Sequence, residues 1–201
     1  MILILDFKIG NVGAVYNALN FLKFKSKISN NVIDIKNAYK IIIPGSGNFG
    51  EGIKKIKNLK IIEDLNEKVL IKKTPILGIC LGYQIMFEKS EENENYSGLN
   101  WINGRVLKFN KKKFFPVPHV GWNNINFKNF SLTKNIPNDS KFYFNHSYFT
   151  KVLEKNQNYG ETNYINKFKS LFEKENIFGC QPHLEKSQKF GLQMLKNFCD
   201  L

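Results

Sequence analysis

Arginine is almost absent from this chain of 201 residues: Arg105 is the only one, although lysine brings the net charge to +13. Arginine is the side chain best suited to recognising phosphates and bases through paired hydrogen bonds. The lysines are spread along the chain, and only Lys111, Lys112 and Lys113 form a run. We therefore interpret the positive charge as a solvated lysine surface and expect no nucleic-acid partner.

Cysteine and histidine are also scarce, with three of each. The odd number of cysteines, Cys80, Cys180 and Cys199, lacks the spacing of a disulfide framework. The scattered cysteines and histidines do not have metal-ligand spacing either. No apolar run is long enough to span a membrane, and residues 1–5 are too short for the apolar part of a signal peptide. We expect a cytoplasmic protein without a metal, a cofactor or a membrane partner.

The first half of the chain alternates between apolar strands and amphipathic helices. Short apolar or β-branched runs predict strands at 2–5, 26–29, 40–43 and 76–79, with Pro44 ending the third. Apolar residues at helical spacing predict helices at 12–24, 53–58, 61–71 and 81–87. This alternation predicts a parallel, doubly wound sheet.

The second half has a different pattern, in which short strands dominate. An acidic, polar stretch at 88–95 is typical of a surface loop. Strands are predicted at 104–109, 121–127, 141–145, 159–162, 169–173 and 177–181. Ser187 is expected to cap a final helix at 188–198. The fold class is therefore α/β, with an open, largely parallel sheet, a mixed and antiparallel region in the second half, and one domain spanning residues 1–201.

The stretch Gly78-Ile79-Cys80-Leu81-Gly82 follows the strand at 76–79. Gly-x-Cys-x-Gly between a strand and a helix is a cysteine version of the nucleophile elbow, a sharp turn that lifts the nucleophile clear of the sheet. The following helix would aim its amides at the sulfur and favour the thiolate. The alternative is a buried structural cysteine between two packing glycines.

A cysteine nucleophile needs an imidazole, and His183 is the candidate. It follows the strand at 177–181, so it lies at the carboxyl end of a strand, where open α/β sheets place their sites. Glu185 is two residues away and can orient the ring. The alternative is a surface histidine beside an ion-paired glutamate.

The glycine-rich loop from Pro44 to Gly50 also follows a buried strand. It can aim backbone amides at an oxyanion. It lacks the Gly-Lys-Ser/Thr ending of a phosphate-binding P-loop, and it can also be an ordinary strand-to-helix turn.

Four motifs occur in the order found in class I (triad) glutamine amidotransferases, which the chain resembles over nearly its whole length. They are Pro44-Gly45-x-Gly47, Gly78-Ile79-Cys80-Leu81-Gly82-x-Gln84, Tyr143-Phe144-x-His146-Ser147-Tyr148 and His183-x-Glu185-Lys186-Ser187. Within that family, Pro118-His119-x-Gly121-Trp122-Asn123 is most similar to the glutaminase subunits of imidazole glycerol phosphate synthases.

The resemblance implies a role for each matching residue. Cys80 would attack the side-chain amide of L-glutamine, and His183, oriented by Glu185, would carry the proton. The oxyanion hole would use Gly45, Ser46, Gly47 and Leu81. The glutamine pocket would use Gln84, His146, Ser147 and Tyr148. The face that docks on a (βα)8-barrel cyclase, to form a heterodimer that channels ammonia, would use His119, Gly121, Trp122, Asn123 and Lys186.

The chain departs from the family pattern at a few places. Pro182 precedes His183 and Leu184 follows it, where the family usually has an aromatic residue and a proline. Proline fixes φ near about −65° and removes an amide donor, so Pro182 bears on the angle at which His183 faces Cys80. Ser46 stands for a usual valine and Asn145 for a usual apolar residue.

The resemblance implies a glutaminase subunit whose ammonia serves the synthesis of imidazole glycerol phosphate and an aminoimidazole carboxamide nucleotide, in histidine biosynthesis. Three alternatives stay open. Ser46 and the departures around His183 motivate a paralogue that supplies another acceptor, such as a surface sugar undergoing amidination. Pro182 motivates a weakly catalytic interaction subunit. The third alternative is a stand-alone thiol hydrolase on a related elbow fold.

Overall fold

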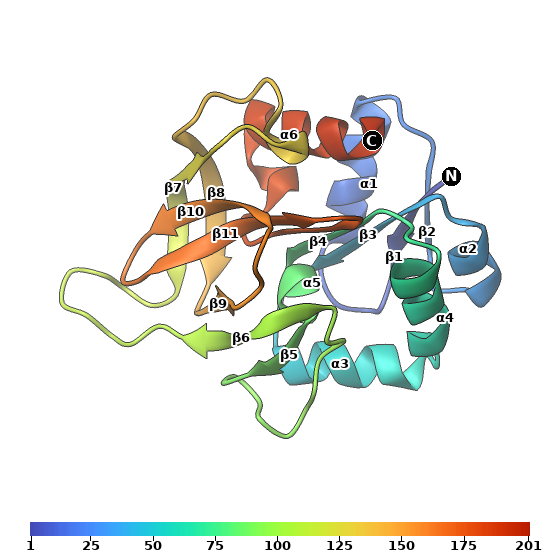
Figure 1. Ribbon diagram of the computed structural model, residues 1–201, viewed down its shortest axis with the longest axis horizontal. Helices are drawn as coiled ribbons and strands as arrows, with labels where there is room; N and C mark the ends of the chain where they lie inside the picture. The colour runs from blue at the N-terminus through green and yellow to red at the C-terminus, as the bar shows by residue number, and fades with distance from the viewer.

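A nine-stranded sheet with the order β2-β1-β3-β4-β12-β11-β10-β7-β8 crosses the computed structural model, which describes residues 1–201 (Figure 1). The strands of this sheet are β1 (Ile2–Leu5), β2 (Ser26–Ser29), β3 (Lys40–Gly45), β4 (Ile76–Cys80), β7 (His119–Phe127), β8 (Ser140–His146), β10 (Asn158–Asn163), β11 (Lys167–Lys174) and β12 (Ile177–Cys180). A smaller sheet has the order β5-β6-β9 and consists of β5 (Phe87–Ser90), β6 (Ile102–Lys108) and β9 (Tyr148–Val152).

The strands β2, β1, β3, β4 and β12 pair in parallel. Every residue of β1, β3 and β4 is buried, as expected for strands covered on both faces. Alternate side chains enter two cores: Ile2 and Ile4 pack into one, and Leu3 and Leu5 into the other.

Helices cover both faces of this parallel half (Figure 1). The first core lies under α1 (Val12–Phe21) and α6 (Gln188–Asp200). The second core contains side chains of α2 (Val32–Asn37), α3 (Phe49–Asn58), α4 (Ile62–Asn66) and α5 (Leu81–Gln84), together with the small sheet. The remaining strands of the large sheet, from β12 to β8, pair antiparallel. The predicted fold class is confirmed.

Several element boundaries differ from those predicted. The helix after Cys80 ends at Gln84, and Phe87 to Ser90 form β5, so part of the expected loop at 88–95 is a strand. The fully buried Phe87 pairs with Ile102, which the local sequence does not reveal. The structure also contains α2 and β9, which were not predicted, and a π-helical turn (Glu67–Ile71) divides the helix expected at 61–71.

The prediction that Pro44 ends the third strand was wrong, because β3 continues to Gly45 and pairs Pro44 with Ile79 of β4. The pairing of β3 with β1 stops at Ile42, so Pro44 lies past the last residue that β1 bonds. A proline is tolerated there because its missing N–H removes no bond to β1. None of the helices is both long enough and apolar enough to cross a bilayer.

Candidate active site

Cys80 ends β4 and immediately precedes α5, in a backbone conformation (φ 53°, ψ −108°) that side-chain-bearing residues rarely adopt. The turn requires the glycines on either side. A Cβ on Gly78 would lie 2.6 Å from the carbonyl oxygen of Gly82, and a Cβ on Gly82 would lie 1.7 Å from that of Ile43. The sequence therefore forms the sharp turn of a nucleophile elbow at Cys80.

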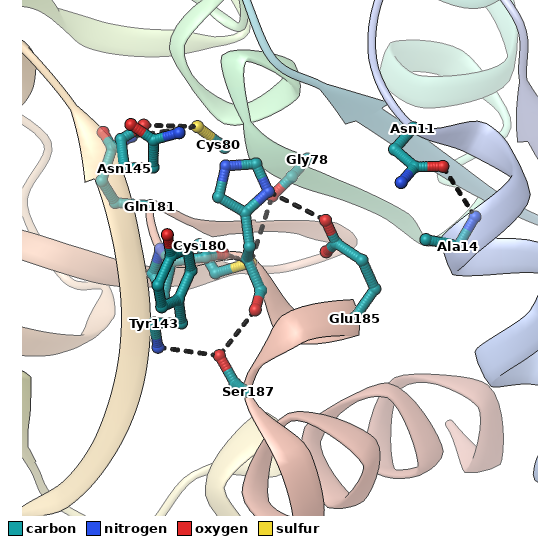
Figure 2. Close-up of polar contacts among 12 residues, drawn as sticks. Asn11, Ala14, Gly78, Cys80, Tyr143, Asn145, Cys180, Gln181, Glu185 and Ser187 are labelled. Carbon is teal, nitrogen blue, oxygen red and sulfur yellow. Dashed lines mark hydrogen bonds and ion pairs between the residues drawn. The ribbon is translucent and has the colours of Figure 1, made fainter. Parts of the chain in front are cut away.

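His183 and Glu185 form a buried pair at the carboxyl end of β12, the strand beside β4. The Nδ1 of His183 lies 2.9 Å from Oε1 of Glu185, and both side chains are only 4% exposed. Figure 2 shows Glu185 and Gln181 on opposite sides of Cys80. Because Nδ1 donates to Glu185, Nε2 is the nitrogen left for proton transfer, and within the chain it has no hydrogen-bond partner.

The neighbours of His183 favour the protonated form of its imidazole. Burial by itself lowers the pKa of His183, but the interactions of the ring with Cys80 and Glu185 outweigh burial and raise that pKa to about 10. Cys80 is thus one of the groups that stabilise the imidazolium.

Ser187 fixes the backbone of His183, which corrects its predicted role. It precedes α6, but its side chain makes no capping hydrogen bond. Its hydroxyl instead donates to the carbonyl oxygen of His183 at 2.6 Å and accepts from the N–H of Tyr143 at 3.0 Å (Figure 2). His183 also donates its N–H to the carbonyl of Tyr143 at 2.9 Å. Strand β8 therefore anchors the histidine, although Pro182 precedes it.

A cavity of about 240 Å³ opens beside Cys80. Seven of the residues expected at the site line it: Ser46, Gly47, Leu81, Gln84, His146, Ser147 and Tyr148. Asn145, which departs from the family pattern, also lines it, together with Glu92 and Pro118. The glutamine-pocket residues are therefore brought together against the sulfur. Gly45 does not line the cavity: it is buried, and a Cβ there would lie 2.9 Å from the side chain of Leu81.

The loop after β3 keeps two amide groups free near this cavity. Neither Ser46 nor Gly47 donates its N–H to a carbonyl in the turns and loops. Both residues are exposed, and Gly47 has a positive φ of 136°. The side chain of Asn145 is exposed as well, whereas its carbonyl oxygen lies 4.0 Å from the sulfur of Cys80.

His146 and His119 form a buried, neutral pair behind the cavity. Burial lowers the pKa of His146 to about 3 and that of His119 to about 4. The carbonyl of Tyr148, 2.7 Å from Nδ1 of His146, can only accept, so Nε2 of His146 accepts from Nδ1 of His119 at 3.0 Å. The Nε2 of His119 then accepts from the amide of Asn123 at 3.2 Å. Each group in this chain thus donates to the next, from Asn123 on β7 through His119 and His146 to the carbonyl of Tyr148 at the cavity.

The residues expected to meet a partner divide into two groups. His119 is 3% exposed and stacks on Phe144 and Tyr164, so its side chain does not face outward as expected. Trp122 is 46% exposed, and Lys186 is exposed beside it over the ring of Tyr143. Gly121 and Asn123 are half-buried on the same strand.

Sequence reasoning missed Glu92 and Gln181. Glu92 lies in the acidic stretch that was expected to be a surface loop, yet its carboxylate accepts from the N–H of Phe49 at 2.7 Å and lines the cavity. Gln181 is fully buried next to Cys80. Its position directly before the Pro182-His183 pair was the available signal.

A family profile and the sequences of known proteins both match this chain over nearly its whole length. The sequence profile of the family described as glutamine amidotransferase class-I matches residues 3–201. Imidazole glycerol phosphate synthase subunit HisH 2 of Methanococcus maripaludis is 42% identical, covering 98% of each chain. Imidazole glycerol phosphate synthase subunit HisH 1 of Campylobacter jejuni is 40% identical and covers 100% of each.

Solved structures give the same fold. A crystal structure of a glutamine amidotransferase matches with a TM-score of 0.77 at 12% identity, over 99% of this chain and 97% of the other. The structure of PurLQS from Thermotoga maritima matches with a TM-score of 0.72 at 17% identity, over 99% of this chain and 97% of the matched one.

Proposed function

This chain belongs to the class I glutamine amidotransferase family, and from that membership we propose that Cys80, His183 and Glu185 are its catalytic triad for hydrolysing L-glutamine. The observation that carries the proposal is the buried His183–Glu185 pair at 2.9 Å beside a cysteine on a nucleophile elbow. The protonation of His183 fits this role. With its pKa raised to about 10, its imidazolium is a proton donor at neutral pH.

The reaction begins when the sulfur of Cys80 attacks the side-chain carbonyl carbon of glutamine. A carbon–sulfur bond forms, and the carbonyl electrons move onto oxygen. The backbone amides of Leu81, Ser46 and Gly47, three residues that line the cavity beside Cys80, are the proposed donors to this oxyanion. Each such donor contributes roughly 10²–10³ in rate.

The intermediate collapses when its carbon–nitrogen bond breaks. The Nε2 of His183 gives its proton to the leaving nitrogen, and ammonia departs. A glutamyl thioester remains on Cys80. His183 then removes a proton from a water molecule, which attacks the thioester and releases glutamate and the thiolate. Glu185 keeps the ring oriented and stabilises the imidazolium in both halves of the cycle.

The cavity provides recognition groups for the rest of the substrate. The carboxylate of Glu92, held by the N–H of Phe49, is suited to the α-ammonium group of glutamine. Gln84, Ser147 and Tyr148 also line the cavity and supply polar atoms to it. His146 stays neutral, which suits a wall that supports hydrogen bonds without adding charge.

We also propose that the chain is the glutaminase subunit of an imidazole glycerol phosphate synthase and passes ammonia to a (βα)8-barrel cyclase. The names of full-length relatives at about 40% identity support this assignment. The exposed Trp122 beside Val120, with Lys186 nearby, supports a docking role for this face. Docking there would keep ammonia away from water, where it becomes ammonium and loses its nucleophilic lone pair. We place the reaction in the cytoplasm, since Cys80 must be a free thiol.

The triad is tested with Cys80→Ala in the reconstituted complex. Glutamine-dependent synthesis should disappear, while ammonium-dependent synthesis by the cyclase should remain, because only the first needs the thiolate. Cys180→Ala is the matched control, since Cys180 is buried and its sulfur faces backbone carbonyls. Unchanged glutamine-dependent turnover in Cys80→Ala would refute the mechanism.

A second candidate is a paralogue that feeds a different ammonia acceptor. Methanococcus maripaludis has two relatives of this chain, named as HisH 1 and HisH 2, at 39% and 42% identity. Ser46 in the oxyanion loop and Pro182 before His183 also depart from the usual pattern. Complementation of a histidine auxotroph, with the cyclase from the same source, separates the two. Growth supports the histidine pathway, and failure of a folded, glutaminase-active complex supports the paralogue.

A further inference from the structure

The amide of Gln181 touches the nucleophile and is not explained by the triad. Gln181 directly follows β12 and is fully buried, and its backbone N–H donates to the carbonyl of Ser170 at 2.8 Å. Its side-chain nitrogen lies 3.7 Å from the sulfur of Cys80, within hydrogen-bond range for sulfur. Figure 2 shows this contact on the side of Cys80 that faces away from Glu185.

The orientation of this amide follows from its neighbours. The Nε2 of Gln84 donates to the backbone carbonyl of Tyr148 at 3.0 Å, and a carbonyl can only accept. The same nitrogen lies 3.1 Å from Gln181, so the oxygen of Gln181 must face it. The NH₂ group of Gln181 therefore points at Cys80, and a fixed backbone oxygen determines the direction of the whole chain of amides.

The two polar neighbours of the sulfur have opposite electrostatic effects. The carbonyl oxygen of Asn145, at 4.0 Å, repels a thiolate and accepts from a thiol. The NH₂ group of Gln181 donates, and donation to an ionised acceptor is roughly twice as strong as donation to a neutral one. The Gln181 amide therefore stabilises a thiolate at Cys80, whereas the carbonyl oxygen of Asn145 destabilises it.

We propose that Gln181 is a positioning residue for glutamine hydrolysis, holding the Cys80 thiolate by one N–H and joining it to the glutamine pocket through Gln84. The inference deepens the proposed function and rests on it for its kinetic consequence. Its effect on the sulfur can be measured without turnover. A residue that only fills space beside the elbow would not tune the sulfur in this way.

The test is the pH profile of Cys80 alkylation by iodoacetamide in the full-length chain, read at Cys80 by peptide mass spectrometry. Gln181→Met keeps the length of the side chain and removes the donor. Its alkylation midpoint should move upward by about one pH unit, a tenfold loss of thiolate below the midpoint. Gln181→Glu should shift it further, because a carboxylate repels the thiolate.

The matched control is Gln193→Met. Gln193 lies on α6, half-buried, and its amide contacts Asn197 instead of the active site. Its alkylation midpoint should equal that of the unmodified sequence. Thermal melting of each variant identifies any that fail to fold, and the Gln181→Glu variant remains as the second test of the donor.

In the complex, the glutaminase kcat/KM of Gln181→Met should fall about tenfold near neutral pH and recover above the new midpoint. Equal midpoints in a folded Gln181→Met and the unmodified chain would overturn the inference, even with an active glutaminase. A shifted midpoint in a chain that never hydrolyses glutamine would support the role of Gln181 and refute the proposed function, so the two failures are distinguishable.

Discussion

At the scale of single residues, Cys80 carries a backbone strain that fits its proposed role as the nucleophile. A positive φ of 53° with a Cβ attached is unfavourable by about 1–3 kcal/mol, whereas glycine adopts it freely. The glycines at 78 and 82 relieve contacts around the turn but leave Cys80 itself in the strained conformation. The proposed nucleophile is therefore held in place at the expense of stability.

Cys80→Gly should consequently lose less stability than Cys180→Gly, although it is inactive. Both changes remove a buried side chain and add the flexibility of glycine to the unfolded chain, but only the first relieves backbone strain. We expect the two losses in the free energy of unfolding to differ by about 1–3 kcal/mol. Differential scanning calorimetry measures both variants, and equal losses would contradict the presence of strain at Cys80.

Glu185→Gln should lower the pKa of His183, because an amide no longer supplies the negative charge that helps to raise it to about 10. Glutaminase kcat should fall at least about 100-fold, since the imidazolium and its orientation both lose support. NMR titration of the His183 ring measures the pKa. The control is Glu154→Gln at the surface pair with Lys174, which should leave both quantities unchanged.

At the scale of secondary-structure elements, the active site depends on how β8 and β12 are joined. Ser187 connects them by bonding the carbonyl of His183 and the N–H of Tyr143. This is a tertiary contact, and it explains why the residue before α6 leaves the helix amides uncapped. The orientation of His183 therefore depends on two strands and on the turn between β12 and α6.

Ser187→Ala should weaken both folding and catalysis. The buried N–H of Tyr143 loses its acceptor, which destabilises the fold by about 1–3 kcal/mol. Glutaminase kcat should fall roughly tenfold as His183 becomes less fixed. Ser140→Ala is a matched control, because Ser140 is also buried and donates to the carbonyl of Pro137, away from the site. Equal kcat losses in the two variants would argue against a specific role for Ser187.

The sequence predicted those parts of the site whose geometry is local. Gly78, Cys80 and Gly82 specify their own turn, and His183 and Glu185 are close enough in sequence to orient one another. The fold class and the family were also predicted, and both are confirmed. The roles of individual residues and the docking face remain predictions.

What the sequence could not predict depends on distant partners. Phe87 to Ser90 resemble the end of a helix and a loop, but β6 converts them into a strand. Glu92 lies in a polar stretch, and only the amide of Phe49 reveals that its carboxylate turns inward. Ser187 has the local pattern of a helix cap, but its hydroxyl accepts from the N–H of Tyr143 and not from an amide of α6. In each case a tertiary contact overrides a local preference.

At the scale of the whole molecule, buried histidines oppose one another in their effect on stability. His119 and His146 have pKa values lowered to about 4 and about 3, so the unfolded chain binds their protons first as the pH falls. Their contribution to the free energy of unfolding is therefore lost progressively as the pH falls below ~6.5. His183 has a raised pKa, so its contribution is present below pH ~6.5 and is lost as the pH rises toward about 10.

The free energy of unfolding should therefore be largest near neutral pH. Between about pH 6 and 4.5 it should fall by up to about 1.4 kcal/mol per pH unit for each of the two lowered histidines. His119→Gln keeps a donor and an acceptor but has no titrating ring. Its free energy of unfolding should therefore fall less steeply with pH, by up to about 1.4 kcal/mol per pH unit. Urea denaturation across this pH range provides the comparison, and identical slopes would exclude His119 as a contributor.

The position of β12 has a consequence for synthesis on the ribosome. β12 lies between β4 and β11, yet it is made about 100 residues after β4. Until then, every nascent chain presents β4 as an apolar sheet edge, the kind of surface that aggregates. The proposed nucleophile, Cys80, also emerges long before its proposed base, His183, so an unfinished chain holds the thiol without the rest of the proposed triad. Insertion of β12 joins the two halves of the sheet, and the residues that follow β12 complete the proposed triad.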